Sequence, residues 1–225
     1  MIDFDYTVQR SRRRSTSIQI NDGCVVIKVP LQAEDHWIQS LLMDRASWIK
    51  PRLEQQKVYK AKYDVDPESG CIPLFGDTFN LYFTGSDTES RIDEVAKNLY
   101  LSVSKRSTTR SRERVLKSFL FDLANTSLLL RTDHLSKLTS LTPSEVRVAN
   151  YKRKWGQCSN LGVITLNWRI IHLPRELQDY VIIHELCHLK EMNHSSRFWS
   201  LVHDFYPDYR TASNEIKSRF SFLNW

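Results

Sequence analysis

The amino-acid sequence predicts an α+β fold, because runs typical of β-strands dominate its first half and helical patterns dominate its second half. As far as residue 104, turn residues separate short apolar runs. Residues 111–138 contain neither Gly nor Pro, and their leucines recur at helical spacing. This change in composition predicts two domains, a β-rich part with one helix over residues 1–104 and a second domain over residues 105–225.

The chain begins with a predicted β-hairpin. Residues 15–20 and 25–29 are rich in β-branched side chains, and the turn cluster of residues 21–23 between them contains a Gly that can take a positive φ. A helix is predicted over residues 34–56, where apolar side chains recur with a period close to 3.6. Pro51 lies inside this pattern, and we expect it to kink or shorten the helix.

A small antiparallel sheet and a long helix are predicted next. Short apolar runs at residues 72–75, 79–83 and 99–103 are separated by turn residues, and the last of them alternates as a half-buried strand does. The helix covers residues 111–138, where the leucines form an apolar stripe along one face.

The last third of the chain predicts two strands and three helices. The strands cover residues 146–149 and 163–168, with a polar, Gly-containing stretch between them. The first helix begins at a proline, which is favoured at the first helical position, and covers residues 174–192. The second covers residues 196–205, and the third covers residues 208–220.

The charge of the chain is concentrated in two regions. The formal net charge is +6, from 32 basic and 26 acidic residues. Residues 1–60 carry 10 basic and 7 acidic side chains, residues 111–160 carry 9 and 4, and residues 161–225 balance at 7 and 7. Such an excess makes an acidic partner such as DNA or RNA a candidate without proving one.

Two basic clusters could contact a nucleic acid. The first is Arg12, Arg13 and Arg14, for which a solvated strand edge that discourages aggregation is the alternative. The second lies at the start of the long helix and could form a groove with a later basic run. Its residues are Lys105, Arg106, Arg110, Arg112, Arg114 and Lys117, and the later run is Lys152, Arg153 and Lys154.

The sequence predicts a cytoplasmic location. Two acidic residues stand among the first five, and no apolar segment of a secretory signal follows them. No run approaches the roughly 18 apolar residues of a membrane span. The four cysteines show no CxxC spacing, which favours reduced thiols over a disulfide framework.

The predicted helix over residues 174–192 contains the sequence His-Glu-Leu-Cys-His, an HExxH pattern. His184 and His188 lie one helical turn apart on one face, where both imidazoles can bind one zinc ion. Glu185 lies about 100° round the helix, which suits a carboxylate that bonds a water on the metal rather than the metal itself. Apolar residues surround this motif, so the helix is expected to be buried. Burying two imidazoles and a carboxylate without a metal would cost free energy.

A catalytic zinc site needs a third protein ligand, and His194 follows the motif at a suitable distance. Asn193 tolerates the left-handed backbone that reverses a chain after a helix, so we expect it to end the helix and return His194 to the metal. The spacing of the three histidines equals that of metzincins. However, Glu191 replaces their glycine and no methionine follows Met192, so the metzincin pattern is rejected.

Residues 151–209 resemble the YgjP-like metallopeptidases, relatives of the SprT-like and WLM zinc peptidases. The resemblance lies in Arg-Lys-Trp-Gly-Gln-Cys-Ser at 153–159, Ile-Thr-Leu-Asn-Trp-Arg at 164–169 and the segment 180–194, and it extends to Phe198-Trp199 and Pro207-Asp-Tyr209. Residues 10–20 resemble the opening strand of the family more weakly. Gln157 is a departure, since the family usually has Ser there.

The resemblance implies a zincin-like core, in which the long helix, a small sheet and the HExxH helix pack together over residues 105–225. It implies zinc held by His184, His188 and His194 with Glu185 as general base, as the spacing predicts. A donor for the oxyanion is expected among Tyr206, Tyr209 and Arg197, although packing or surface roles are the alternative for each.

The remaining candidate features have plain structural readings. The strand over residues 163–168 is either an edge to which a peptide substrate adds or an ordinary core strand. Cys158 and Cys187 are predicted to be buried thiols rather than nucleophiles. The four histidines without ligand-like spacing are expected to be solvated: His36, His134, His172 and His203.

The leading hypothesis is a zinc metallopeptidase acting on proteins or peptides, without a membrane partner. The alternative is a nucleic-acid-associated binding module, or a DNA-linked protease, in which zinc has a structural or regulated role; some SprT-like relatives are DNA-associated proteases. A structural zinc ion is closed by four protein ligands, whereas a catalytic one keeps an open position. The substrate and the oligomeric state stay open at this point.

Overall fold

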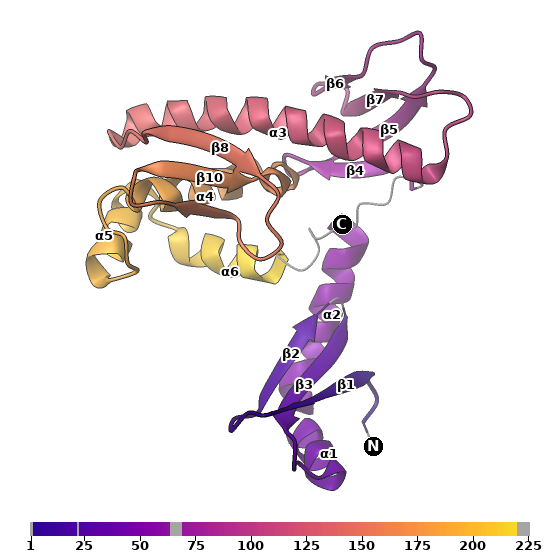
Figure 1. The fold of residues 1–225 in the computed structure, drawn as a ribbon, viewed down its shortest axis with the longest axis vertical. Helices are drawn as coiled ribbons and strands as arrows, with labels where there is room; N and C mark the ends of the chain where they lie inside the picture. Colours follow the sequence, from indigo (N-terminus) through magenta and orange to yellow (C-terminus); the bar gives the residue numbers. More distant parts are fainter. Residues whose placement is uncertain (1, 22, 64–68, 220–225) are drawn as a thin grey trace. The chain divides into compact units, whose positions relative to one another are not determined.

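The structure, a computed structural model, describes residues 2–21, 23–63 and 69–219. Contacts divide the chain into two compact units, residues 1–62 and 63–225, which we call the N-terminal and the C-terminal unit. Each unit combines helices with small sheets (Figure 1), so the predicted α+β class is confirmed. Among the helices that the structure describes, none has the length and apolar character that a membrane span needs.

The N-terminal unit contains a three-stranded sheet of order β1-β3-β2. The predicted hairpin is confirmed: β2 (Ser17–Asn21) and β3 (Cys24–Pro30) pair antiparallel with Ile20 opposite Val25, and Gly23 has a φ of +76°. The strand β1 (Tyr6–Ser11) pairs parallel with β3 and was not predicted, because its polar side chains give no alternating apolar pattern. The three arginines at 12–14 lie between β1 and β2.

Two helices follow this sheet, where the sequence predicted one. Helix α1 (Asp35–Asp44) ends at Arg45, and α2 (Ala46–Tyr63) begins directly after it. The carbonyl of Arg45 accepts from the backbone N–H of Ile49 at 2.9 Å, so the first turn of α2 starts there. Pro51 lies inside α2, which continues to Tyr63, so the expectation that it shortens the helix was wrong. Because Pro51 comes early in α2, its missing N–H removes a single bond near the helix start.

The core of the N-terminal unit lies between the sheet and the two helices. Alternate residues of β3 are fully buried, as the two-residue period of a strand requires. They pack against buried residues of α1 and α2 in one cluster. The buried members of this cluster are Val25, Ile27, Val29, Ile38, Leu42, Ile49 and Leu53.

The C-terminal unit begins with a four-stranded sheet of order β4-β5-β7-β6. Its strands are β4 (Cys71–Leu74), β5 (Asp77–Thr84), β6 (Arg91–Asp93) and β7 (Asn98–Ser102). The predicted strands are confirmed, but the sheet is not wholly antiparallel, since β5 and β7 pair parallel. The short β6 lies between them in sequence and pairs antiparallel with β7 at the edge, so β5 and β7 become neighbours with the same direction.

The long predicted helix is confirmed as α3 (Thr109–Thr139), which runs past both sheets of this unit (Figure 1). The hydroxyl of Thr108 accepts from the N–H of Ser111 and caps its start. Ser140 ends it in the left-handed conformation with a φ of +56°. The buried face of α3 carries residues such as Leu116, Leu120 and Leu128, at helical spacing.

The second sheet of this unit has the order β8-β10-β9. The strands β8 (Glu145–Ala149) and β10 (Val163–Asn167) are confirmed, and the three-residue β9 (Gly156–Cys158) is additional. The strand β10 is central, parallel to β8 and antiparallel to β9. The interpretation of this strand as an edge that receives a peptide was therefore wrong, and β8 and β9 are the edge strands of this sheet.

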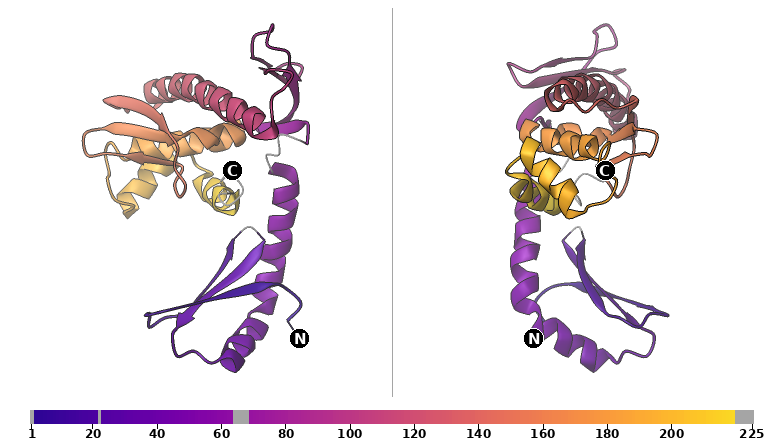
Figure 2. Two further views of the ribbon diagram at one scale, coloured as in Figure 1. Left: turned by 45° about the vertical axis from the view of Figure 1, so that its right-hand side comes forward. Right: turned by 90° about the vertical axis from the view of Figure 1, so that its left-hand side faces the viewer.

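A 3-10 helix, η1 (Trp168–His172), leads from β10 into three further helices, α4 (Arg175–Cys187), α5 (Ser196–Phe205) and α6 (Tyr209–Arg219). Pro174 is the cap residue of α4 rather than its first residue. Helix α4 contacts α3, α5, α6, β9 and β10, as Figure 2 lets the reader follow. The three predicted helices are therefore confirmed, and the first is shorter than predicted.

The predicted domain boundary near residue 105 falls inside the C-terminal unit. One core cluster contains Phe79 and Leu101 of the first sheet, Leu116 of α3, Ile164 of β10 and Ile182 of α4. The first sheet and α3 therefore share their core. The change in composition near residue 105 marks the change from strands to a long helix. The division between the two compact units comes earlier, after residue 62.

A buried histidine joins η1 to the first sheet. His172 is 1% exposed, and its Nδ1 lies 2.6 Å from the carbonyl oxygen of Pro73, so Nδ1 carries the proton and donates it. The expectation that His172 is solvated was wrong, because η1 turns it into the core. Burial lowers the pKa of His172 to about 4, while the bond to Pro73 acts in the opposite direction.

We predict that this histidine makes the C-terminal unit acid-sensitive. The unfolded chain takes up a proton at the ordinary pKa of about 6.5 and the folded chain does so at about 4. Stability that is present above pH 6.5 is therefore lost as the pH falls toward 4, by about 3 kcal/mol. Urea denaturation measures the free energy of unfolding at each pH. Between pH 7 and pH 4, the loss of this free energy should be smaller by about 3 kcal/mol in His172→Gln than in the wild-type protein. Parallel curves for the two proteins would contradict the prediction.

Candidate metal centre

Helix α4 carries the HExxH motif at its C-terminal end. His184 and Glu185 belong to its last turn, Cys187 is its last residue, and His188 is the cap residue with φ −64° and ψ −16°. Because His188 keeps helical backbone angles, it still lies one turn after His184 on the same face. The backbone therefore provides the pairing of imidazoles that the spacing predicts.

The chain turns after α4 and brings His194 back to this face. Backbone N–H groups of Leu189 and Glu191 donate to the carbonyls of Leu186 and Cys187, at 3.0 and 3.1 Å. The expectation that Asn193 takes the left-handed conformation was wrong, because it is not among the residues with positive φ. A hydrogen-bonded turn directly after α4 reverses the chain instead.

The three imidazoles converge. One nitrogen from each of His184, His188 and His194 lies within 4.8 Å of the others, which makes this group able to hold a metal ion. The Nε2 atoms of His184 and His194 are 3.0 Å apart. The ring centroids of His184 and His188 are 5.0 Å apart, and those of His188 and His194 are 4.8 Å apart.

The protonation of His188 is fixed by its neighbour. Its Nδ1 lies 3.0 Å from the carbonyl oxygen of Glu191, which can only accept, so Nδ1 carries the hydrogen and Nε2 keeps its lone pair. Such a bond to the second nitrogen orients an imidazole for metal binding. The Nδ1 of His184 is buried and makes no hydrogen bond within the described part of the chain.

Burial favours the neutral form of the imidazoles of His184 and His188. It lowers the pKa of His184 to about 3, with His188 and His194 acting in the same direction. It lowers the pKa of His188 as well, and here the carbonyl of Glu191 opposes the shift. Metal binding needs unprotonated imidazole, so at neutral pH no proton has to leave these two ligand nitrogens.

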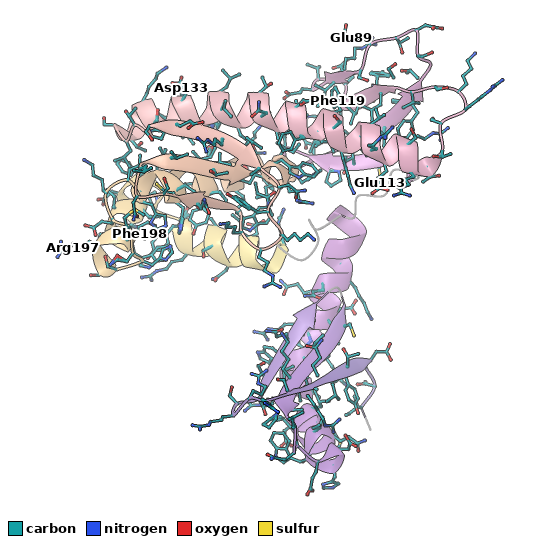
Figure 3. The ribbon with its side chains drawn as sticks, in the orientation of Figure 1. Glu89, Glu113, Phe119, Asp133, Arg197 and Phe198 are labelled. Carbon is teal, nitrogen blue, oxygen red and sulfur yellow. The ribbon has the colours of Figure 1, made fainter. Side chains whose placement is uncertain are left out.

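Aromatic side chains from α5 support the histidine rings. The ring of Phe198, a residue labelled in Figure 3, stacks on His188 with centroids 4.4 Å apart. The ring of Trp199 stacks on His194 with centroids 5.5 Å apart and on Tyr209 with centroids 5.2 Å apart. The imidazoles are thereby held between α4 and a wall of rings, which limits their rotation.

Glu185 points to a different part of the surroundings, against β9. Glu185 is 6% exposed. This burial raises the pKa of Glu185 to about 8, and the positive charge of Lys154 opposes the shift. Gly156 lets the carboxylate approach this closely: a Cβ at Gly156 would lie 2.8 Å from both Cγ and Oε1 of Glu185. Such distances are too short for a real contact, so a side chain at this position would require Glu185 or β9 to shift.

A cavity of about 460 Å³ opens beside Glu185, and we call it the Glu185 cavity. Helix α4, the segment that leads into β9, and α6 form its walls. Tyr180 from α4 and Ser213 from α6 line it. Burial raises the pKa of Tyr180, and a hydrogen bond to Ser213 opposes this shift. Sequence reasoning missed Tyr180 and Gly156. The spacing of four between Tyr180 and His184 was the available signal.

None of the three candidate oxyanion donors lines the Glu185 cavity. The hydroxyl of Tyr206 donates to the carbonyl of Glu176 at 3.1 Å, and its ring lies 5.6 Å from that of Tyr180. The hydroxyl of Tyr209 accepts from Arg210. Arg197 is exposed, and Figure 3 shows it at the outer side of α5.

The two basic clusters of the C-terminal unit line different surfaces. Arg110, Arg114 and Lys117 surround a hollow at the start of α3, where Lys117 pairs with Glu113. Arg153 and Lys154 line the Glu185 cavity. The hollow and the cavity share no lining residue, and a groove formed by both clusters, like contact with DNA or RNA, stays a prediction.

Comparison with known proteins gives a family. Residues 14–219 match the YgjP-like, metallopeptidase domain family. Among solved structures, the crystal structure of the metallopeptidase zymogen of Pyrococcus abyssi abylysin is 28% identical, and the alignment covers 41% of this chain and 93% of that one with a TM-score of 0.38. No curated protein matches the chain significantly.

We predict that Gly156→Ala displaces the Glu185 carboxylate without disturbing the histidines. The added methyl group must push Glu185 or β9 aside, which we expect to cost about 1–3 kcal/mol of stability. Gly85→Ala is the matched control, since a Cβ there meets nothing within 4 Å. Urea denaturation and a crystal structure of each variant measure the two effects. Equal stability of both variants and an unmoved carboxylate would contradict the prediction.

Proposed function

Because this chain belongs to the YgjP-like metallopeptidase family, we propose that it is a zinc-dependent peptidase in which His184, His188 and His194 hold the ion and Glu185 is the general base. The observation that carries the proposal is the convergence of the three imidazoles beside the C-terminal end of α4, which also carries the buried Glu185. The substrate class is protein or peptide, as the family designation implies.

The donor set fits zinc. Two nitrogens bound to one tetrahedral zinc ion at about 2.0–2.1 Å lie about 3.3–3.4 Å apart. The Nε2 atoms of His184 and His194 are 3.0 Å apart, so small rotations of the rings suffice to reach this geometry. Among the described residues, the candidate group contains three ligands, which matches a catalytic site with an open position rather than a structural site closed by four.

The proposed chemistry divides between the ion and Glu185. A bound zinc ion supplies Lewis acidity, which acidifies water and polarises a carbonyl group. Glu185 takes the proton of the attacking water on a carboxylate oxygen and returns it to the leaving amine. Its burial and its position against Gly156 restrict where the carboxylate can lie during both transfers.

An extended peptide would reach this site along β9. The strand β9 pairs with β10 on one side only, and within the described chain no strand pairs with its other side. A peptide can add to such an edge through backbone hydrogen bonds. Gly156 of β9 touches Glu185, so a peptide bound there would pass the general base.

The donor to the oxyanion remains among the predicted candidates. Tyr206 is the most suitable of them, because its ring contacts Tyr180, which lines the Glu185 cavity. Its hydroxyl would have to leave the carbonyl of Glu176 during the reaction. Tyr209 stacks on Trp199, and Arg197 is exposed on α5. Both side chains would therefore need larger movements than Tyr206 to reach the oxyanion.

We propose a zincin-like core formed by α3, the β8–β10 sheet and α4, on the contacts among these elements. The free thiols of the four cysteines support a cytoplasmic location.

We predict that Glu185→Gln abolishes hydrolysis and keeps the metal. The amide retains the shape of the side chain but cannot accept a proton from water, so kcat should fall by about 10²–10⁴-fold. Bound zinc, measured by elemental analysis after dialysis, should stay at one ion per chain. Peptide hydrolysis at more than a tenth of the wild-type rate would refute the role of Glu185.

We predict that His194→Ala weakens zinc binding. The loss of one of three ligands should reduce the affinity by at least about 10²-fold, which a titration with a competing chelator measures. His134→Ala is the control, because His134 is exposed on α3 outside the histidine group. Full affinity in the His194 variant would assign the third ligand to another residue.

A further inference from the structure

The Glu185 cavity has an apolar interior and two cations. Trp155, Val181 and Ile216 supply apolar wall, while Arg153 and Lys154 supply positive charge. Both cations are exposed, whereas Glu185 is buried. The positive charge therefore lies on the solvent side of the cavity and the general base lies on its inner side.

Glu185 is the one acidic residue among the described residues that line the cavity with Arg153 and Lys154. Within the described residues, neither takes part in a salt bridge, while Arg131, Arg147 and Arg175 in the same unit each pair with an acidic residue. The contacts of Lys154 are neutral: its Nζ donates to the side-chain oxygen of Gln157 and lies 4.4 Å from the centre of the Tyr151 ring. These two contacts position the ammonium group without neutralising its charge.

From this arrangement we propose that the Glu185 cavity is a specificity subsite for a carboxylate-bearing residue next to the scissile bond. The inference rests on the proposed peptidase function and names its substrate class. A guanidinium group binds a carboxylate with two parallel hydrogen bonds, and an ammonium group adds a point charge. A Glu or Asp side chain places its methylene groups against the apolar wall and its carboxylate at Arg153 and Lys154.

The size of the cavity agrees with this occupant. A volume of about 460 Å³ is within the range of small-ligand sites, which is about 300–1,000 Å³, and it exceeds what one side chain fills. The carboxylate can come from a side chain or from the C-terminus of a peptide. A nucleic-acid phosphate would be attracted by the same charges, but the apolar wall favours a group with a hydrocarbon stem.

The test measures binding to zinc-loaded Glu185→Gln protein, which cannot consume the probe. The probes are fluorescent hexapeptides with amidated C-termini that differ only in Glu or Gln at each central position, followed by fluorescence anisotropy. At one position, Glu should bind about fivefold to tenfold more tightly than Gln. A second pair, with a free or an amidated C-terminus and no Glu, determines whether a terminal carboxylate is the preferred source.

Variants separate the subsite from general charge effects. In Arg153→Met, the preference for Glu over Gln should fall to about twofold or less, and the affinity for Gln peptides should not change. Lys152→Met is the matched control, because Lys152 carries the same charge one residue earlier and does not line the cavity. It should keep the preference. Zinc content of each variant confirms that the site is intact.

The outcomes decide between the claims. Equal binding of every Glu and Gln pair and of both C-terminal forms would overturn the subsite. A preference that persists in the double variant Arg153→Met and Lys154→Met would also overturn it. Displacement of the peptides by a single-stranded oligonucleotide, without any discrimination between Glu and Gln, would assign the cations to nucleic acid instead. If wild-type protein cleaves no peptide but binds Glu peptides preferentially, the proposed function fails and the subsite stands.

Discussion

Helix α4 is surrounded by other elements on almost every side, and its burial is the constraint on which the rest of the C-terminal unit depends. A buried polar group needs a partner, and α4 carries several. Asp179 forms two hydrogen bonds of 2.6 Å with Arg131 of α3, and Gln178 donates to the carbonyl of Leu173 at 2.8 Å. These bonds fix α4 against its neighbours, so the remaining polar groups, His184 and Glu185, are held in a defined place at its end.

The features that follow from local periodicity could be predicted from the sequence. The stripe of leucines predicts α3, and the spacing of four places His184 and His188 on one face. Both follow from the geometry of one helix. His194 could be predicted because it comes soon after α4, where a short turn can return it. The mechanism of that return could not, since the turn depends on backbone hydrogen bonds to Leu186 and Cys187 rather than on Asn193.

Features that depend on contacts between distant segments were missed. The burial of His172 depends on Pro73, which is 99 residues away in the chain, and no pattern around His172 indicates it. The edge strand β9 has three residues, which is too short for an alternating pattern, and Gly156 has a meaning only once Glu185 lies against it. The sequence therefore reveals the candidate metal ligands more readily than the residues that surround them.

The stacked rings around the histidines have a consequence for the lifetime of a bound ion. His188 lies on Phe198 and His194 lies on Trp199, and both aromatic residues belong to α5. Neither imidazole can swing away from the ion without losing its ring partner, unless α5 moves as well. Release of the ion is then coupled to local opening of α5, so the dissociation rate reports on the stability of this helix as well as on the strength of the ligand bonds.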